Sequence, residues 1–160
     1  MVDKRARRER PIEVLLVAHD PDDVHQTRAA LRANKLLNTL HVVRDGRAAL
    51  AFLRREGGYA TAPRPDLILW EAAQLEARGT ELLRAIKAHE ELRTIPLVVL
   101  VTPQEEQAVR GAALPVDDYL TKPLTLRQLL HVIQARYAVG FIVVSMAPET
   151  GGAAPPTRWW

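Results

Sequence analysis

Four polar side chains each follow an apolar run of the sequence. They are His19, Glu71, Thr102 and Lys122. A carboxylate and an ammonium can pair or serve as acid and base, an imidazole can do either or bind a metal, and a hydroxyl can bind an anion. One interpretation is an α/β enzyme that uses Glu71, Lys122 and His19 as acid and base. It is the weakest, because the sequence has no phosphate-cradling glycine loop and no nucleophile–base spacing.

The elements that must position these groups alternate along the chain. Runs of apolar residues predict strands over 12–17, 39–43, 67–70, 96–101 and 118–121, and helical patterns separate them. Strands that are apolar on both faces and separated by helices form a parallel sheet covered on both sides. The fold class is therefore α/β, with a doubly wound five-stranded parallel sheet of the flavodoxin-like kind. Sites in this architecture form at the carboxyl ends of the strands, so the four polar groups are expected to share one crevice.

Helix start signals separate the strands. Asp20 can cap a helix that begins at Pro21 and ends near 34–35, and Asp45 with Gly46 opens the next. Further helices are expected over about 80–88, 104–113 and from Thr125 onward, where threonine and glutamine form a capping box. The expected inward residues are Val24, Thr27, Leu31 and Leu36 in the first helix, Leu82, Leu83 and Ile86 in the third, and Leu126, Leu129, Leu130, Ile133 and Tyr137 in the last.

Composition indicates one domain in a reducing compartment. A chain of 160 residues with 48% apolar content is long enough for one core. It has no cysteine, which excludes disulfides and thiolate metal sites. No apolar run reaches the roughly 18 to 20 residues of a membrane span, and the first residues lack the apolar centre of a signal peptide. We therefore expect a cytoplasmic protein without a membrane contact.

The net charge of +3 is confined to the start of the chain. The first ten residues hold five basic and two acidic side chains, so the remaining 17 basic and 17 acidic ones balance. This predicts a basic flexible arm over 1–10, either a solubilising leader or a contact for an acidic partner. The other expected segments are a domain over 11–139, an apolar extension over 140–146 and a flexible tail over 147–160. A nucleic-acid partner is not expected, because the domain has no basic face.

Five segments of the sequence resemble a known family. They are "VLLVAHDPDDVHQTRAAL", "LHVVRDGRAALAFLRREG", "PRPDLILW", "GTELLRAIKAHEELRTIPLVVLVT" and "DDYLTKPL". In this order they are similar to the receiver domains of two-component response regulators, especially the single-domain receivers that partner phytochrome-type histidine kinases. The resemblance covers about residues 12 to 137 and implies the (βα)5 receiver fold.

The resemblance also implies a phosphorylation site, from which this sequence departs. The family places an acceptor aspartate after strand three, a Mg²⁺-binding acidic pair after strand one, and a hydroxyl and a lysine after strands four and five. Glu71 stands at the acceptor position, Ala18 and His19 at the acidic pair, and Val101 at the hydroxyl position, with Thr102 one residue late. Lys122 matches the lysine, and Tyr119 matches the aromatic residue that switches position in the family.

These departures predict a divergent receiver, or pseudo-receiver, that is not an enzyme and holds no metal or other cofactor. Ala18 offers no ligand and His19 offers a nitrogen, whereas Mg²⁺ requires oxygen ligands. Glu71 is expected to form a permanent salt bridge with Lys122, which either fixes the site in one state or is a structural pair without signalling meaning. The alternative function is a phosphoryl-accepting response regulator with weak residual activity.

His19 and Tyr119 each have two interpretations. His19 either hydrogen-bonds Glu71 and gives the crevice a pH response, or is a passive histidine; two ligands are too few for a closed metal site. Tyr119 is either a switch residue or an aromatic at the edge of the core. The expected partners are a histidine kinase or other signalling protein, and a second copy bound through the fourth helix, fifth strand and last helix. The apolar residues 141–144 then pack on their own domain or on that copy.

Overall fold

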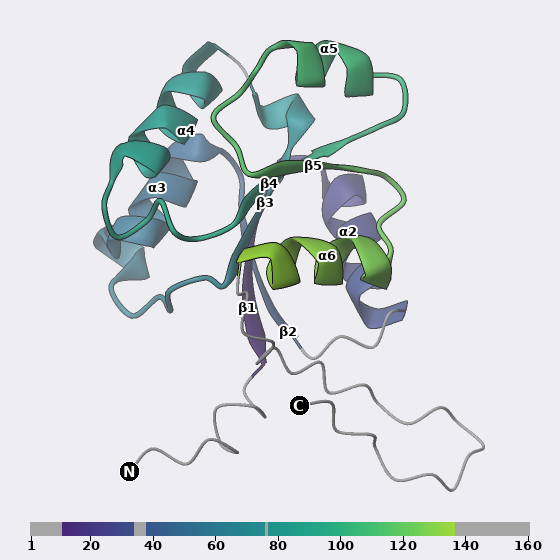
Figure 1. The fold of residues 1–160 in the computed structure, drawn as a ribbon. Coiled ribbons are helices and arrows are strands. Elements are labelled where there is room, and N and C mark those ends of the chain that lie inside the picture. Colours follow the sequence, from purple (N-terminus) through teal and green to yellow (C-terminus); the bar gives the residue numbers. More distant parts are fainter. Residues whose placement is uncertain (1–10, 34–37, 76, 137–160) are drawn as a thin grey trace, which may run out of the picture.

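The computed structural model describes residues 11–33, 38–75 and 77–136, and it confirms the predicted fold class (Figure 1). Five parallel strands form one sheet in the order β2-β1-β3-β4-β5. The chain moves from β1 to β2 in one direction and from β3 to β5 in the other, so the switch point lies between β1 and β3. The strands are β1 (Ile12–Val17), β2 (Asn38–Val43), β3 (Leu67–Glu71), β4 (Leu97–Val101) and β5 (Asp118–Thr121).

Helices cover both faces of this sheet. Figure 1 shows α2 and α6 on one side of the strands and α3 and α4 on the other. Two short 3₁₀ turns flank β3, one before and one after it. The helical elements are α2 (Pro21–Ala33), α3 (Gly46–Arg54), η1 (Gly57–Tyr59), η2 (Ala72–Gln74), α4 (Ala77–Ala88), α5 (Glu106–Gly111) and α6 (Leu126–Arg136).

The predicted caps are present at three helix starts. The Asp20 carboxylate accepts the Asp22 N–H at 2.8 Å. The Asp45 carboxylate accepts the Ala48 N–H at 2.8 Å. At α6 the exchange is reciprocal, because Thr125 Oγ1 accepts the Gln128 N–H at 3.2 Å while Gln128 Oε1 accepts the Thr125 N–H at 2.8 Å. Each bond satisfies an amide that the helix itself leaves without a partner.

The core consists of two apolar clusters, one on each face of the sheet. On the α2 and α6 side, Leu16, Leu31 and Leu129 are members of one cluster. On the α3 and α4 side, Leu15 and Leu83 belong to the other. Every residue of β3 and β4 is buried. The sheet is therefore enclosed on both faces, as its continuous apolar strands predict.

Gly46 allows α3 to approach β3 closely. A Cβ at this position would lie 2.5 Å from Leu82 Cδ1 and 2.9 Å from Trp70 Cζ2. Both distances are shorter than a carbon–carbon contact permits, so the first turn of α3 can rest on the Trp70 indole only because residue 46 has no side chain.

Some predicted boundaries and inward residues differ from the structure. The third helix begins at Ala77, three residues earlier than expected, and the fourth covers only Glu106–Gly111. Leu129 is buried in α6 as expected, together with Val132, which the predicted stripe omits. Leu36 and Tyr137 lie outside the described residues, as do the predicted arm, apolar extension and tail. Within the described ranges no helix has the length and apolarity to cross a membrane.

Candidate functional site

Three of the predicted site residues, Glu71, Lys122 and Ala18, lie at or just after the carboxyl ends of strands. Glu71 is the last residue of β3 and pairs in register with Leu100 of the neighbouring β4. Lys122 follows β5, and its backbone N–H donates to the Val101 carbonyl at 2.8 Å. Ala18 follows β1, and its N–H donates to the Val43 carbonyl at 3.0 Å. Because all strands are parallel, these residues lie at the same end of the sheet, where the sequence predicts the site, and this region is called the crevice below.

A short ion pair occupies this crevice. Lys122 Nζ lies 2.6 Å from Glu71 Oε2. The Glu71 side chain is only 2% exposed, whereas that of Lys122 is 16% exposed. The predicted contact between these two residues is therefore present. The other carboxylate oxygen, Glu71 Oε1, is buried and has no hydrogen-bond partner among the described residues.

Asp23 is a third member of the site, and the sequence did not predict it. Its Oδ1 lies 3.2 Å from Lys122 Nζ. Asp23 belongs to the first turn of α2, where an acidic residue is explained by the helix dipole alone. The one signal in the sequence that could have placed Asp23 in the site is its spacing of three residues from the cap, Asp20. This spacing puts both acids on the helix turn next to the strand ends.

Burial dominates the electrostatics of Glu71. It raises the pKa of the carboxyl to about 7, against the lowering effects of the hydrogen bond and charge of Lys122. Asp23 and Glu105 raise the same pKa further, because two more carboxylates face it. Burial alone would lower the pKa of Lys122, but the hydrogen bonds and charges of Glu71 and Asp23 outweigh it and raise that pKa. Both groups of the pair are therefore charged only above a pH of about 7, so the expected salt bridge is not permanent at all pH values.

His19 does not take part in this pair. It is exposed, and the structure gives it no hydrogen bond to Glu71, whose Oε1 has no partner and whose Oε2 contacts Lys122. Of the two interpretations of His19, the hydrogen bond to Glu71 is therefore absent from the structure: β1 ends at Val17, and His19 is exposed next to the Asp20 cap. The group of the crevice whose pKa is raised to about 7 is Glu71.

The residue at the position where the family has a hydroxyl, Val101, carries none. Val101 is fully buried at the end of β4. Thr102 instead forms a capping box at the following turn, where its Oγ1 accepts the Glu105 N–H at 3.3 Å and Glu105 Oε1 accepts the Thr102 N–H at 2.8 Å. The hydroxyl of Thr102 therefore serves the backbone of the loop before α5.

Tyr119 is held by two contacts at β5. Its hydroxyl accepts the Leu114 N–H at 3.3 Å. The Arg110 guanidinium lies 5.2 Å from the centre of its ring, within the range of a cation–π contact. Arg110 Nε in turn donates to Glu106 Oε1 at 3.0 Å. The ring is thus tied to the α5 side of β5.

The residues at this end of the sheet do not suit Mg²⁺. Ala18 carries no donor atom, and His19 offers a nitrogen where Mg²⁺ requires oxygen. Asp23 and Glu71 both direct an oxygen to Lys122, whose charge occupies the place between them. Across the described part of the chain no group of three or more histidine, aspartate or glutamate side chains is arranged to hold a metal ion. The side chains of the crevice therefore do not fit the Mg²⁺ that the family resemblance implies.

Comparison with known proteins agrees with this fold. The family described as Response regulator receiver domain matches residues 14–134. Response regulator Rcp1 from a Synechocystis strain is 36% identical over 125 residues, which are 78% of this chain and 85% of Rcp1. The bacteriophytochrome response regulator AtBRR has a TM-score of 0.66 at 33% identity, over 78% of this chain and 91% of AtBRR. The phosphorylated cyanobacterial phytochrome response regulator RcpA has a TM-score of 0.60 at 35% identity, over 79% and 91%.

The parallel sheet with its polar crevice is that of a two-component receiver, and this chain belongs to the response regulator receiver domain family. Receivers of this family are regulatory signalling modules. Within the family, the chain is similar to the response regulator Rcp1 and to the phytochrome response regulators RcpA and AtBRR.

Proposed function

We propose that this protein is a pseudo-receiver, a two-component signalling module that acts through protein contacts without being phosphorylated. The observation that carries the proposal is the contact of 2.6 Å between Glu71 and Lys122. The lysine that binds a phosphoryl group in the family is here bound by a carboxylate of the chain itself. Asp23 binds the same ammonium, so Lys122 has two intramolecular partners.

Three further features support the same proposal. Glu71 is almost fully buried, which keeps its carboxylate from a phosphodonor. The metal that would stabilise charge on a transferring phosphoryl group has no suitable ligands at Ala18 and His19. Val101 has no hydroxyl to bind a phosphoryl oxygen or to draw Tyr119 inward. RcpA was solved in a phosphorylated form. This chain would therefore share the fold of RcpA but not its phosphorylation.

The proposed partners are a phytochrome-type histidine kinase or another signalling protein, and a second copy of the chain. The surface formed by α5, β5 and α6 is the proposed contact. On it Glu106, Arg110 and Tyr119 form a linked polar and aromatic group. Such a group offers one aromatic face with charge of both signs, which suits a protein partner.

Exposure to a small-molecule phosphodonor with Mg²⁺ tests the proposal. Intact-mass analysis of the wild-type chain is expected to show no phosphoryl adduct. A repaired variant that carries Ala18→Glu, His19→Asp, Glu71→Asp and Val101→Thr is the matched control, and it is expected to bind Mg²⁺ and to gain the mass of one phosphoryl group. Trp70 fluorescence, with Trp159 and Trp160 replaced by phenylalanine, follows the binding of Mg²⁺.

The alternative function predicts a different result. A phosphoryl group mapped to Glu71 in the wild-type chain would establish a response regulator with weak residual activity and contradict the proposal. Saturable Mg²⁺ binding by the wild type that Glu71→Gln abolishes would contradict it as well. Binding of a phytochrome-type histidine kinase to the wild-type chain without ATP, measured by calorimetry, is the positive result that the proposal requires.

A further inference from the structure

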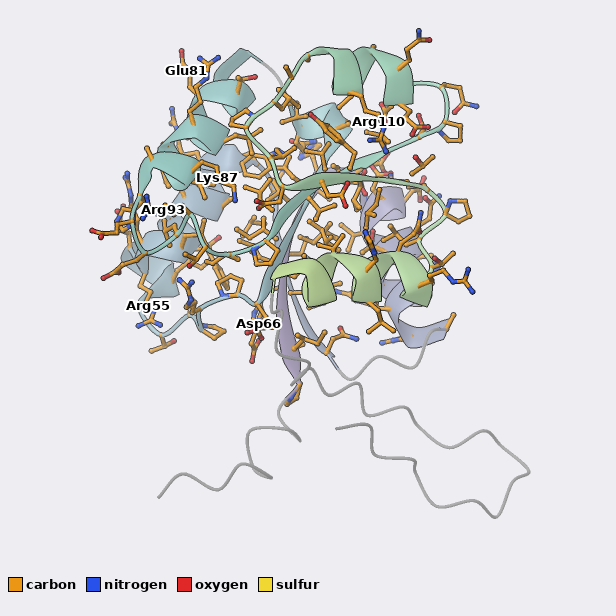
Figure 2. The ribbon with its side chains drawn as sticks, viewed as in Figure 1. Arg55, Asp66, Glu81, Lys87, Arg93 and Arg110 are labelled. Atoms are coloured by element: carbon orange, nitrogen blue, oxygen red, sulfur yellow. The ribbon has the colours of Figure 1, made fainter. Side chains whose placement is uncertain are left out.

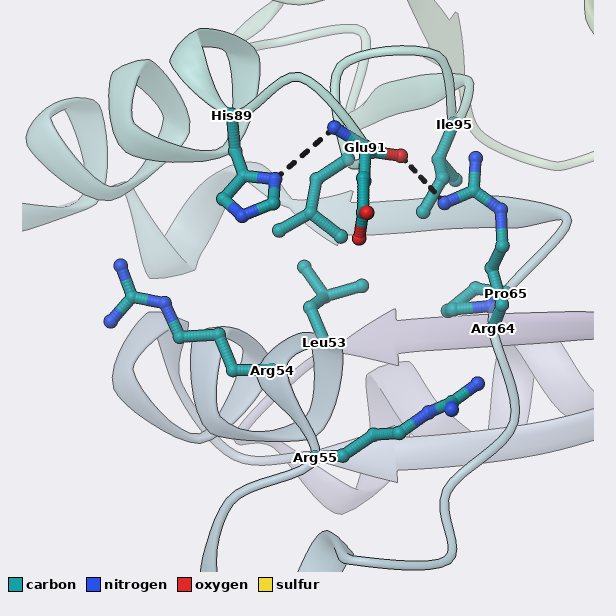
Figure 3. Close-up of a pocket in the computed structure, with 9 residues that line it drawn as sticks. Leu53, Arg54, Arg55, Arg64, Pro65, His89, Glu91 and Ile95 are labelled. Atoms are coloured by element: carbon teal, nitrogen blue, oxygen red, sulfur yellow. Dashed lines mark hydrogen bonds between the residues drawn. The ribbon is translucent and has the colours of Figure 1, made fainter.

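A pocket lies at the end of the sheet opposite Glu71. Its volume is about 320 Å³, and it is lined by the last turn of α3, the segment before β3 and the loop between α4 and β4 (Figure 3). Arg64 and Pro65 come just before β3, of which Glu71 is the last residue. Figure 2 shows Arg55 and Asp66 at the end of the domain where β3 begins. The pocket is therefore separate from the crevice.

The floor of the pocket is apolar and mostly buried. Ile95 is fully buried and Leu92 is 6% exposed. Leu53 of α3 and Pro65 complete this floor, and Pro65 is also buried. These side chains belong to the core or border on it, so their surface is present before any ligand arrives. An apolar floor of this kind suits the carbon skeleton of a small molecule.

Three arginines surround the floor, and they differ in how they are held. Arg64 is fixed, since its Nη1 donates to the Glu91 carbonyl at 2.6 Å and its Nη2 to Thr94 Oγ1 at 2.8 Å. Arg54 has a distant contact of 3.9 Å with Glu56, with both side chains well exposed. For Arg55 the described residues provide no side-chain partner. Two guanidinium groups thus remain available to an anion.

The backbone at Arg55 is in a conformation that usually belongs to glycine. Its φ of 56° and ψ of 43° are left-handed, at the residue that ends α3. A side chain in this region costs free energy that glycine would not, and the position after a helix is the one where glycine is preferred. An arginine here places a long cation at the pocket.

His89 and Glu91 add directed polar groups. The Glu91 N–H donates to His89 Nδ1 at 3.2 Å. Because Nδ1 accepts, the neutral ring carries its proton on Nε2. Figure 3 shows this second nitrogen and the Glu91 carboxylate on the side of the pocket. The pocket therefore offers one further donor to an anion, and one acceptor for a hydroxyl or amine.

We propose that this pocket binds a small organic phosphate. The organic group would lie on the floor formed by Leu53, Leu92 and Ile95. The phosphate oxygens would accept from the His89 ring and from Arg54 and Arg55, whose exposed side chains extend to opposite sides of Leu53 in Figure 3 and would turn toward the bound phosphate. A phosphate monoester has three terminal oxygens and up to two negative charges, so it matches several separate donors better than a carboxylate does. Glu91 favours a ligand that also carries a hydroxyl or amine. This site goes beyond the proposed signalling function and does not depend on it.

Phenyl phosphate is the probe, and inorganic phosphate and phenol are its two halves. Amide chemical shifts of the full chain, recorded at fixed ionic strength, are expected to saturate at millimolar phenyl phosphate around Arg55, His89 and Leu92. Each half alone is expected to bind more weakly. Arg54→Gln and Arg55→Gly should each weaken binding by about tenfold or more, the usual effect of losing a charge-assisted hydrogen bond. Arg47→Gln, at the other end of α3 and outside the pocket, is the matched control and should have no effect.

The thermal midpoint separates a binding role of Arg55 from a structural one. Glycine suits the left-handed backbone, so Arg55→Gly should keep or raise the midpoint while it weakens binding. Absence of saturation, equal binding of inorganic phosphate, or equal loss in the Arg47→Gln variant would each overturn the proposal. One further result would overturn it too: Arg55→Gly loses binding and has a lower midpoint, while Arg54→Gln binds normally.

Discussion

The Asp23 carboxylate and the Lys122 ammonium lie 3.2 Å apart although 99 residues separate them in the sequence. This contact joins the first turn of α2 to the loop after β5. It also gives Lys122 a partner that is independent of Glu71. Protonation of Glu71 therefore neutralises one carboxylate of the crevice without leaving the buried ammonium unpaired, which reduces the cost of holding the site together at low pH.

Glu71→Gln is expected to change how stability depends on pH. The pKa of Glu71 is raised to about 7 from an ordinary 4.5, so between these values the folded state holds a proton that the unfolded state has lost. Wild-type stability must then fall as pH rises from about 4.5 to about 7. Glutamine has no proton to lose. Across this window the free energy of unfolding of the variant should therefore increase relative to that of the wild type by on the order of 2 kcal/mol.

Urea unfolding at a series of pH values measures this difference. Glu81→Gln is the control, because Glu81 is an exposed residue of α4 outside the crevice. A constant difference between Glu71→Gln and the wild type from pH 4.5 to 7 would mean that Glu71 titrates normally in the folded state.

Lys122→Met should be more damaging than Glu71→Gln at pH 8. The methionine leaves the carboxylates of Glu71 and Asp23 facing each other without a cation, and removing one partner of a buried pair costs about 3 to 5 kcal/mol. The double variant should cost less than the sum of the two, with a coupling of about 0.5 to 3 kcal/mol. At pH 4 the cost of Lys122→Met should shrink, since Glu71 is then neutral.

A double-mutant cycle in chemical denaturant gives this coupling. Lys87→Met is the comparison, because Lys87 is 17% exposed, close to the 16% of Lys122, and pairs with Asp117, which is more exposed than Glu71. Strict additivity of the Glu71 and Lys122 substitutions would show that their contact adds nothing to stability.

Gly46→Ala is expected to destabilise the domain by about 1 to 3 kcal/mol, the usual cost of overpacking. The added methyl group would meet Leu82 and Trp70 at 2.5 Å and 2.9 Å. Because Trp70 precedes Glu71, the shift of α3 should also change the emission of the indole. Thermal unfolding monitored by fluorescence measures both effects. Gly58→Ala, which meets nothing within 4 Å, is the control and should be close to neutral.

The fold was predictable from local patterns, and the site only in part. Continuous apolar strands indicated the sheet, and Asp45, Thr125 and Gln128 indicated helix starts, because each signal acts within a few residues. The contact between Glu71 and Lys122 could be predicted from the parallel topology alone. Asp23 and the burial of Glu71 depend on how α2 lies across the strand ends. That placement is set by tertiary packing, which no local pattern records.

The last prediction concerns assembly through α5, β5 and α6. The sequence after α6 contains Phe141, Ile142, Val143 and Val144, and burying each such side chain contributes roughly 1.5 to 3 kcal/mol. An isologous dimer would bury these residues on both copies. Light scattering at tens of micromolar is expected to show a dimer for the full chain and a monomer for a chain ending at Ala138. Arg110→Glu, which reverses the charge over Tyr119, should weaken the dimer, whereas Arg84→Glu, at an exposed position of α4, should not. A full chain that stays monomeric would mean that these residues pack on their own domain.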